Sequence, residues 1–230
     1  MSGHAAPQEI VRELALQLLV MVLSLSVHEC AHAWAAFRLG DDTAARQGRL
    51  SLSPVTHVDP IGTLLIPAVG VLLGGFGFIG WARPTPVNPT RFRKGIGMRW
   101  GMAIVAAAGP LSNLLLALLA LGGFSLMVRA GVGVGGHASG PAMFVVTLFY
   151  VNVGLAIFNL LPLPPLDGSQ LLPRSFDGFK QAVAPYSFLL LMVVINVRTL
   201  REPLLEVPFR LAVHGLQSLV GLRLLADGAF

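Results

Sequence analysis

The chain has 230 residues, of which 54% are hydrophobic and only 12% are charged, against roughly 25% charged residues in ordinary soluble domains. Its mean hydropathy is +0.73. A soluble fold of this size could not bury so much apolar surface, whereas a lipid bilayer accepts it. The composition therefore excludes an ordinary soluble domain and predicts one all-α, polytopic integral-membrane domain covering residues 1–230.

In a soluble protein, the net charge of +5 would suggest that the protein binds nucleic acid. Here the basic residues flank apolar segments and no aromatic-plus-basic platform accompanies them, so membrane topology and anionic lipid explain them better and we expect no nucleic-acid partner. The single cysteine, Cys30, excludes an internal disulfide. The first residues lack the basic region and cleavage site of a secretory signal peptide, so we expect the first span to be retained.

Four apolar segments have the length of membrane spans, at residues 10–39, 100–128, 142–161 and 182–197. Between the first two lies an apolar segment at residues 61–81 that is too rich in glycine for a straight helix. We expect a re-entrant or β-hairpin-like segment there. The tail at residues 198–230 has basic residues spaced among leucines, which fits an amphipathic helix on the membrane surface or a further short span.

The end of the first span carries the motif His28-Glu29-Cys30-Ala31-His32. On an α-helix, positions i and i+4 lie on one face, so both imidazoles can reach one tetrahedral zinc ion. Glu29 can then reach a water on that ion as a general base. Such a pattern recurs by chance, but ionisable groups directly continuing an apolar span are costly unless they serve a function.

A catalytic zinc usually has three protein ligands, and Asp167 is the candidate for the third. It follows an apolar span in Pro162-Leu163-Pro164-Pro165-Leu166-Asp167-Gly168. The prolines end the helix and favour an extended stretch, and Gly168 permits a tight turn. Taken alone, these residues fit a plain helix-terminating turn equally well.

Together these motifs resemble the site-2 protease family of intramembrane zinc metalloproteases, which is marked by HExxH on one membrane helix and by LDG at the end of a later one. The Gly109-Pro110-Leu111-Ser112-Asn113 segment also matches a family motif, as do stretches at 48–63 and 80–88 typical of compact bacterial members. No PDZ-like or CBS-like insert is visible. The resemblance implies that His28, His32 and Asp167 bind one zinc ion per chain and that Glu29 is the catalytic base.

The ligand set also constrains the topology. If the 61–81 segment crossed the membrane, Asp167 would end on the side opposite to the two histidines. All ligands must lie within about 2 Å of one zinc ion, so we expect this segment not to cross. The basic loop at residues 83–99 then lies on the side of the metal site, which the positive-inside rule makes cytoplasmic.

Secondary candidates are less specific. Asn113 and Asn152 are polar residues within apolar spans, and either could hydrogen-bond a substrate carbonyl or oxyanion, or could instead join helices. His57, close to Asp59, could form a second metal or proton-relay pair, or could be an ordinary loop histidine.

The function predicted from these residues is zinc-dependent endopeptidase activity on membrane-embedded protein substrates, in the inner membrane of a bacterial cell. A membrane zinc hydrolase with a glutamate as third ligand is one alternative. A non-proteolytic zinc-binding membrane protein, such as a transporter or an inactive scaffold, is another, although the presence of Glu29 favours the protease. The sequence names neither the substrate nor the oligomeric state.

Overall fold

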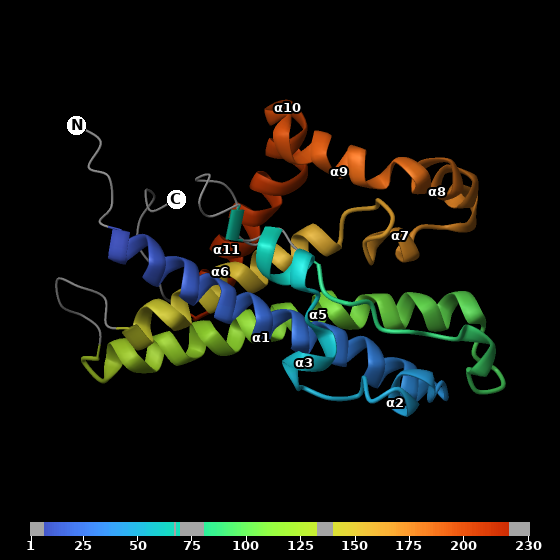
Figure 1. The fold of residues 1–230 in the computed structure, drawn as a ribbon, viewed down its shortest axis with the longest axis horizontal. Coiled ribbons are helices and arrows are strands. Elements are labelled where there is room, and N and C mark those ends of the chain that lie inside the picture. The colour runs from blue at the N-terminus through green and yellow to red at the C-terminus, as the bar shows by residue number, and fades with distance from the viewer. Residues whose placement is uncertain (1–6, 67, 70–80, 133–139, 221–230) are drawn as a thin grey trace. The chain divides into compact units, whose positions relative to one another are not determined.

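The computed structural model describes residues 7–66, 68–69, 81–132 and 140–220, and within these ranges every regular element is a helix (Figure 1). Four helical stretches are long and apolar enough to cross a membrane: Val11–Leu39, Met98–Arg129, Gly140–Asn159 and Arg174–Asn196. The predicted all-α, multi-pass membrane protein is thereby confirmed. The chain divides into two compact units, Met1–Ser112 and Asn113–Phe230, which are described separately.

Helix α1 (Pro7–Leu39) is the long helix of the first unit. It ends at Gly40, which takes a φ of 108°, while the backbone N–H of Asp41 bonds to the carbonyl of Ala36 and that of Gly40 to the carbonyl of Phe37. This pattern is a Schellman C-cap, which a glycine adopts without steric cost. Two single-turn helices follow, α2 (Thr43–Arg46) and α3 (Pro54–His57).

The two ends of the 61–81 segment meet. The segment starts in a π-helical turn, η1 (Pro60–Leu65), whose first amides bond to the side chain of Asp59. The backbone N–H of Trp81 donates to the carbonyl of Gly62 at 3.1 Å, and the Thr63 hydroxyl donates to the carbonyl of Trp81 at 2.8 Å. The predicted re-entrant or hairpin form concerns mainly residues 67 and 70–80, which lie outside the described part of the chain.

Residues 81–93, which we call the strap, then run along the C-terminal half of α1, in the same direction as the helix, from Glu29 to Leu39. The strap is extended apart from a short 3-10 turn, η2 (Pro89–Arg91). Its Arg83 amide bonds to the carbonyl of His57 and its Arg93 amide to the carbonyl of Leu39, both at 2.8 Å. Val87 and Phe92 pack on a small apolar cluster formed by α1 and by the start of α5 (Met98–Arg129).

The second unit is built on α6 (Gly140–Asn159) and the later part of α5. Its apolar core includes Leu121, Phe149 and Val153, and Val213 of α11 (Val207–Val220) belongs to the same core. Within the predicted tail, α11 thus packs its apolar residues against α6, and both alternatives for the tail, a surface helix or a short span, stay predictions. The remaining helices of this unit are α7 (Gly168–Leu171), η3 (Arg174–Phe176), α8 (Asp177–Val183), η4 (Ala184–Tyr186), α9 (Ser187–Asn196), α10 (Arg198–Arg201) and η5 (Glu202–Glu206).

The last apolar stretch starts at Arg174, earlier than the predicted residue 182. It is a series of short helices, and the 3-10 turn η4 contains Pro185. Proline lacks the N–H that a continuous helix needs and crowds the preceding turn, which accounts for the interruption.

Candidate metal centre

The imidazoles of His28 and His32 face each other one turn apart on α1. Their Nε2 atoms are 3.0 Å apart, and their rings stand nearly perpendicular, with centroids separated by 4.6 Å. Both side chains are buried, with exposed fractions of 3% and 7%. The predicted pairing of the two histidines on one helix face is what the structure shows.

The donor set fits zinc. Two nitrogens at about 2.0–2.1 Å from a tetrahedral ion would be about 3.3 Å apart, so the observed 3.0 Å needs to open by only a few tenths of an ångström. A carboxylate oxygen of Glu29 joins the two ring nitrogens in a group whose ligand atoms all lie within 4.8 Å of one another. Two imidazole nitrogens with a carboxylate beside them form a donor set that catalytic zinc sites use.

The first half of α5 orients His32. The Nδ1 atom of His32 lies 2.7 Å from the backbone carbonyl of Val105, a hydrogen bond between residues 73 positions apart in the sequence. A carbonyl can only accept, so the proton sits on Nδ1 and the lone pair of Nε2 is left for a metal. This is the outer partner that metal-binding histidines usually have.

Gly109, one turn further along α5, gives both imidazoles their space. A Cβ atom built on Gly109 would lie 2.5 Å from Cε1 of His28 and equally close to Cε1 and Nε2 of His32. The Gly-Pro motif identified in the sequence thus includes the residue that lets α5 approach the histidine pair. The sequence alone indicates a glycine of special importance here, but not which side chains it contacts.

Glu29 is held by the strap. The backbone N–H of Thr85 donates to Glu29 Oε2 at 2.9 Å, and the Thr85 hydroxyl donates to the backbone carbonyl of Glu29 at 3.1 Å. The Glu29 side chain is 9% exposed. Thr85 was not singled out from the sequence, because its contact spans 56 residues and no local motif signals it.

Asp167 lies in the second unit, at the residue that precedes α7. The preceding chain is not extended as expected from its prolines but turns compactly, with the amide of Leu166 bonded to the carbonyl of Leu163. Gly168 serves close packing, because a Cβ there would lie 2.2 Å from the carbonyl oxygen of Leu160. Since the histidines belong to the other unit, the three-ligand set stays a prediction.

Asn113 and Asn152 contact each other. The amide nitrogen of Asn113 donates to Oδ1 of Asn152 at 2.8 Å, and the Asn152 amide donates to the carbonyl of Leu148 at 2.8 Å. Both side chains are fully buried. These bonds join α5 to α6, and the proposed substrate role of the two residues stays a prediction.

His57 and Asp59 serve the loop that follows α1. His57 is buried and its Nε2 donates to the carbonyl of Ser51 at 2.8 Å. Asp59 Oδ1 accepts from the amides of Ile61 and Gly62. The carboxylate thus caps η1, and a metal or proton-relay role of the pair stays a prediction.

Two buried histidines lie on one face of a helix with a glutamate between them in the sequence, and a glycine of the neighbouring helix faces them. These features define an HExxH metalloenzyme set in a membrane protein. Comparison with known proteins specifies the class. The model of peptidase family M50 matches residues 134–197. YwhC of Bacillus subtilis (strain 168), named a zinc metalloprotease, is 39% identical over 184 residues, which cover 77% of this chain and 78% of that protein.

Two mycobacterial proteins named zinc metalloprotease Rip2 are also similar. The protein of Mycolicibacterium smegmatis is 33% identical over 82% of this chain and 69% of its own length, and that of Mycobacterium tuberculosis (strain H37Rv) is 31% identical over 78% and 66%. No solved structure matches the chain significantly. The chain belongs to peptidase family M50, and it is a zinc-dependent intramembrane protease of the site-2 type.

Proposed function

We propose that His28, His32 and Asp167 hold the zinc ion and that Glu29 is the general base for hydrolysis of peptide bonds in membrane-embedded substrates. The observation that carries this proposal is the pair of Nε2 atoms facing each other at 3.0 Å with the Glu29 carboxylate fixed beside them. Zinc in such a site acidifies water and polarises a carbonyl group.

Several residues around the histidine pair have a defined part in this proposal. Glu29 takes a proton from the attacking water and delivers it to the leaving amine, because its carboxylate forms one close group with the two imidazoles. Val105 keeps His32 in the tautomer that leaves Nε2 unprotonated. The burial of the two histidines and Glu29 excludes bulk water, which strengthens every charge interaction within the site.

The third ligand is tested by Asp167→Asn. An amide is a poorer zinc ligand than a carboxylate, and we expect zinc affinity to fall by at least about 10–100-fold, the range reported for loss of even an outer-shell partner. Zinc content of the purified protein, measured over a series of chelator concentrations, is the readout.

Asp177→Asn is the matched control for this test, since Asp177 lies in the same unit and forms an ion pair with Lys180 at 2.7 Å. Equal zinc affinity in Asp167→Asn and in the control would remove Asp167 from the ligand set and favour a glutamate as third ligand.

The topology proposed from the ligand set has support in the first unit. The ends of the 61–81 segment bond to each other, and the strap that follows bonds to the loop after α1 through Arg83 and His57. A segment whose first and last residues are in contact begins and ends on the same side of the membrane. We propose that α1, α5 and α6 cross, so that the chain before α7 returns to the side on which α1 ends.

Cysteine labelling tests this topology. Single cysteines replace Val55, Thr90 or Val132, whose side chains are solvent-exposed, in a Cys30→Ala background. A membrane-impermeant maleimide is then added to one side of sealed vesicles. We expect positions 55 and 90 to react from the same side and position 132 from the other. Labelling of 55 and 90 from opposite sides would contradict the proposal.

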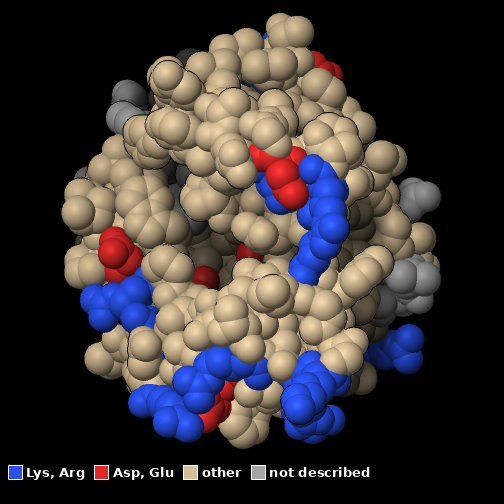
Figure 2. Space-filling model, turned by 90° about the vertical axis from the view of Figure 1, so that its right-hand side faces the viewer, with Lys and Arg blue, Asp and Glu red and all other residues tan. Residues whose placement is uncertain are grey.

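We place the site on the cytoplasmic side of a bacterial inner membrane. In Figure 2, basic side chains gather along the lower part of the face in view, and the exposed basic residues between α1 and α5 are Arg46, Arg83, Arg91, Arg93 and Lys94. Loops rich in arginine and lysine stay on the cytoplasmic side during insertion.

A further inference from the structure

We propose that Thr85 is the positioning residue of the catalytic base, and that the strap serves to present the backbone amide of Thr85 to Glu29. This inference rests on the proposed role of Glu29. Thr85 contacts Glu29 twice, through its backbone N–H to Oε2 at 2.9 Å and through its hydroxyl to the backbone carbonyl at 3.1 Å. One residue therefore fixes the strap relative to α1 and fixes the carboxylate as well.

Within the local tripeptide, the backbone N–H of Thr85 is the one amide donor. Thr85 stands between Pro84 and Pro86, neither of which has a backbone N–H. Prolines also fix their own φ and push the preceding residue toward extended conformations. The tripeptide is thus stiff and offers one amide, and that amide points at the glutamate.

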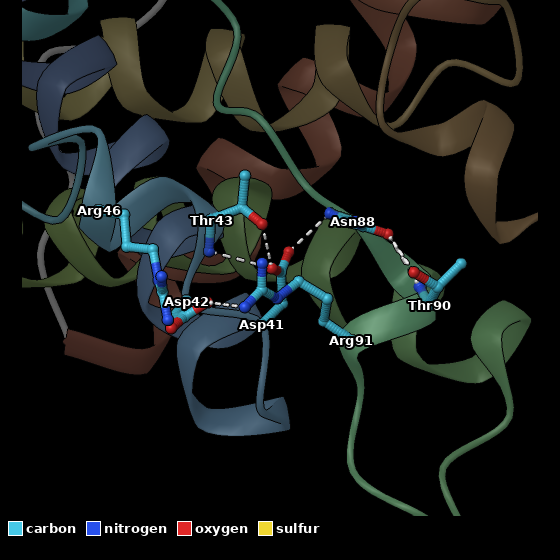
Figure 3. A network of polar contacts seen from close by, with 7 residues as sticks. All are labelled: Asp41, Asp42, Thr43, Arg46, Asn88, Thr90 and Arg91. Atoms are coloured by element: carbon cyan, nitrogen blue, oxygen red, sulfur yellow. Dashed lines mark hydrogen bonds and ion pairs between the residues drawn. The ribbon is translucent and has the colours of Figure 1, made fainter.

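Bonds on both sides of Thr85 hold the strap in place. Upstream, the Arg83 amide bonds to the carbonyl of His57. Downstream, the Asn88 amide donates to Oδ2 of Asp41 at 2.6 Å. Asp41 is fully buried, and its other oxygen accepts from the amide and hydroxyl of Thr43 (Figure 3). A buried carboxylate with three donors ties the strap to the end of the helix that carries the metal motif.

A second anchor lies at Asp42, the residue after Asp41. Asp42 pairs with Arg46 at 2.6 Å and with Arg91 of the strap at 3.0 Å (Figure 3). The hydrogen bond from Arg46 and the charges of both arginines hold the pKa of the Asp42 carboxyl below its usual range, so this anchor is charged at neutral pH. The strap is accordingly fixed at several points to the structure that carries Glu29.

The consequence concerns the geometry of the base. A glutamate side chain has several rotatable bonds, and an unrestrained carboxylate would sample many orientations. With Oε2 held by Thr85, the other oxygen keeps one orientation relative to the histidine pair. A displacement of a catalytic group by about 1 Å can cost about 100-fold in rate, so the restraint acts on turnover.

The experiment compares two variants with the same valine side chain at residue 85, one with a backbone amide before it and one with an ester that lacks the N–H. Thr85→Val keeps the amide and the shape of the side chain, and incorporation of α-hydroxyisovaleric acid at residue 85 replaces that amide by an ester. Comparison of the ester with Thr85→Val isolates the N–H. The matched control is the same pair at residue 93, because the Arg93 amide also ties the strap to α1, through Leu39, without touching the site.

We expect the ester at residue 85 to lower kcat by about 10–100-fold, with KM for a model transmembrane substrate changed less than about 2-fold and zinc content intact. The ester at residue 93 is expected to leave kcat within about 2-fold of Arg93→Val. Equal effects of the two esters on kcat, or an effect at residue 85 confined to KM or to zinc content, would overturn the positioning role.

Glu29→Gln, assayed beside these variants, separates the two proposals. If Glu29→Gln cleaves normally, the assignment of the base fails, and the positioning role fails with it. If Glu29→Gln is inactive and the two esters behave alike, the base stands and only the role of Thr85 is wrong.

Discussion

Glu29→Gln is expected to lower kcat for cleavage of a transmembrane substrate by about 10²–10⁴-fold, the contribution typical of general acid–base catalysis, with zinc still bound in stoichiometric amount. Glutamine matches glutamate in size, and its carbonyl oxygen can accept the hydrogen bond from the Thr85 amide that Oε2 accepts now. The side chain should therefore stay in place while losing the ability to take a proton. The measurement pairs metal analysis with a cleavage assay in the same proteoliposome preparation.

The matched control is Glu13→Gln. Glu13 lies on the same helix, about four turns before the metal motif, and is exposed, so its substitution removes the same charge from α1 without touching the site. We expect full activity from this control. Wild-type turnover by Glu29→Gln would assign the base elsewhere, whereas loss of zinc from that variant would show that Glu29 supports the metal rather than the proton transfer.

Much of the framework follows from sequence alone, for identifiable physical reasons. Apolar segments as long as a bilayer is thick have to be helical, because every backbone group must find a partner within the segment. The end of α1 at Gly40 is likewise local, since a glycine at that position permits the left-handed turn observed. The spacing of His28 and His32 places both on one face of any helix, so their pairing needed no tertiary information.

The parts that sequence could not supply depend on which segments pack together. Val105, Gly109 and Thr85 come within contact of the motif residues only because α5 and the strap pack on α1. Each is an ordinary residue type whose role comes from its partner. The compact turn before Asp167 was missed for a similar reason, because prolines restrict φ but leave the surrounding turns to be decided by packing against the end of α6.

The packing role of Gly109 predicts that Gly109→Ala lowers proteolytic activity by roughly 10²-fold or more, with zinc affinity reduced as well. The added Cβ would lie 2.5 Å from atoms of both imidazoles, closer than carbon atoms approach, so the rings or α5 must move. The rings are buried and His32 is bonded to Val105 of the same helix, which leaves little room for relaxation. Zinc content and the cleavage rate of the purified variant are the measurements.

Gly122→Ala separates this contact from the general effect of alanine in a helix. Gly122 lies on the same helix α5, and a Cβ there meets nothing within 4 Å. Alanine favours a helix interior by about 1 kcal/mol over glycine, so Gly122→Ala should be as stable as the natural protein or more so, and fully active. If Gly109→Ala behaved like Gly122→Ala, the close approach of α5 to the histidine pair would not be a requirement of the site. If it loses zinc while the control keeps it, the glycine is required by the metal centre and not by the helix.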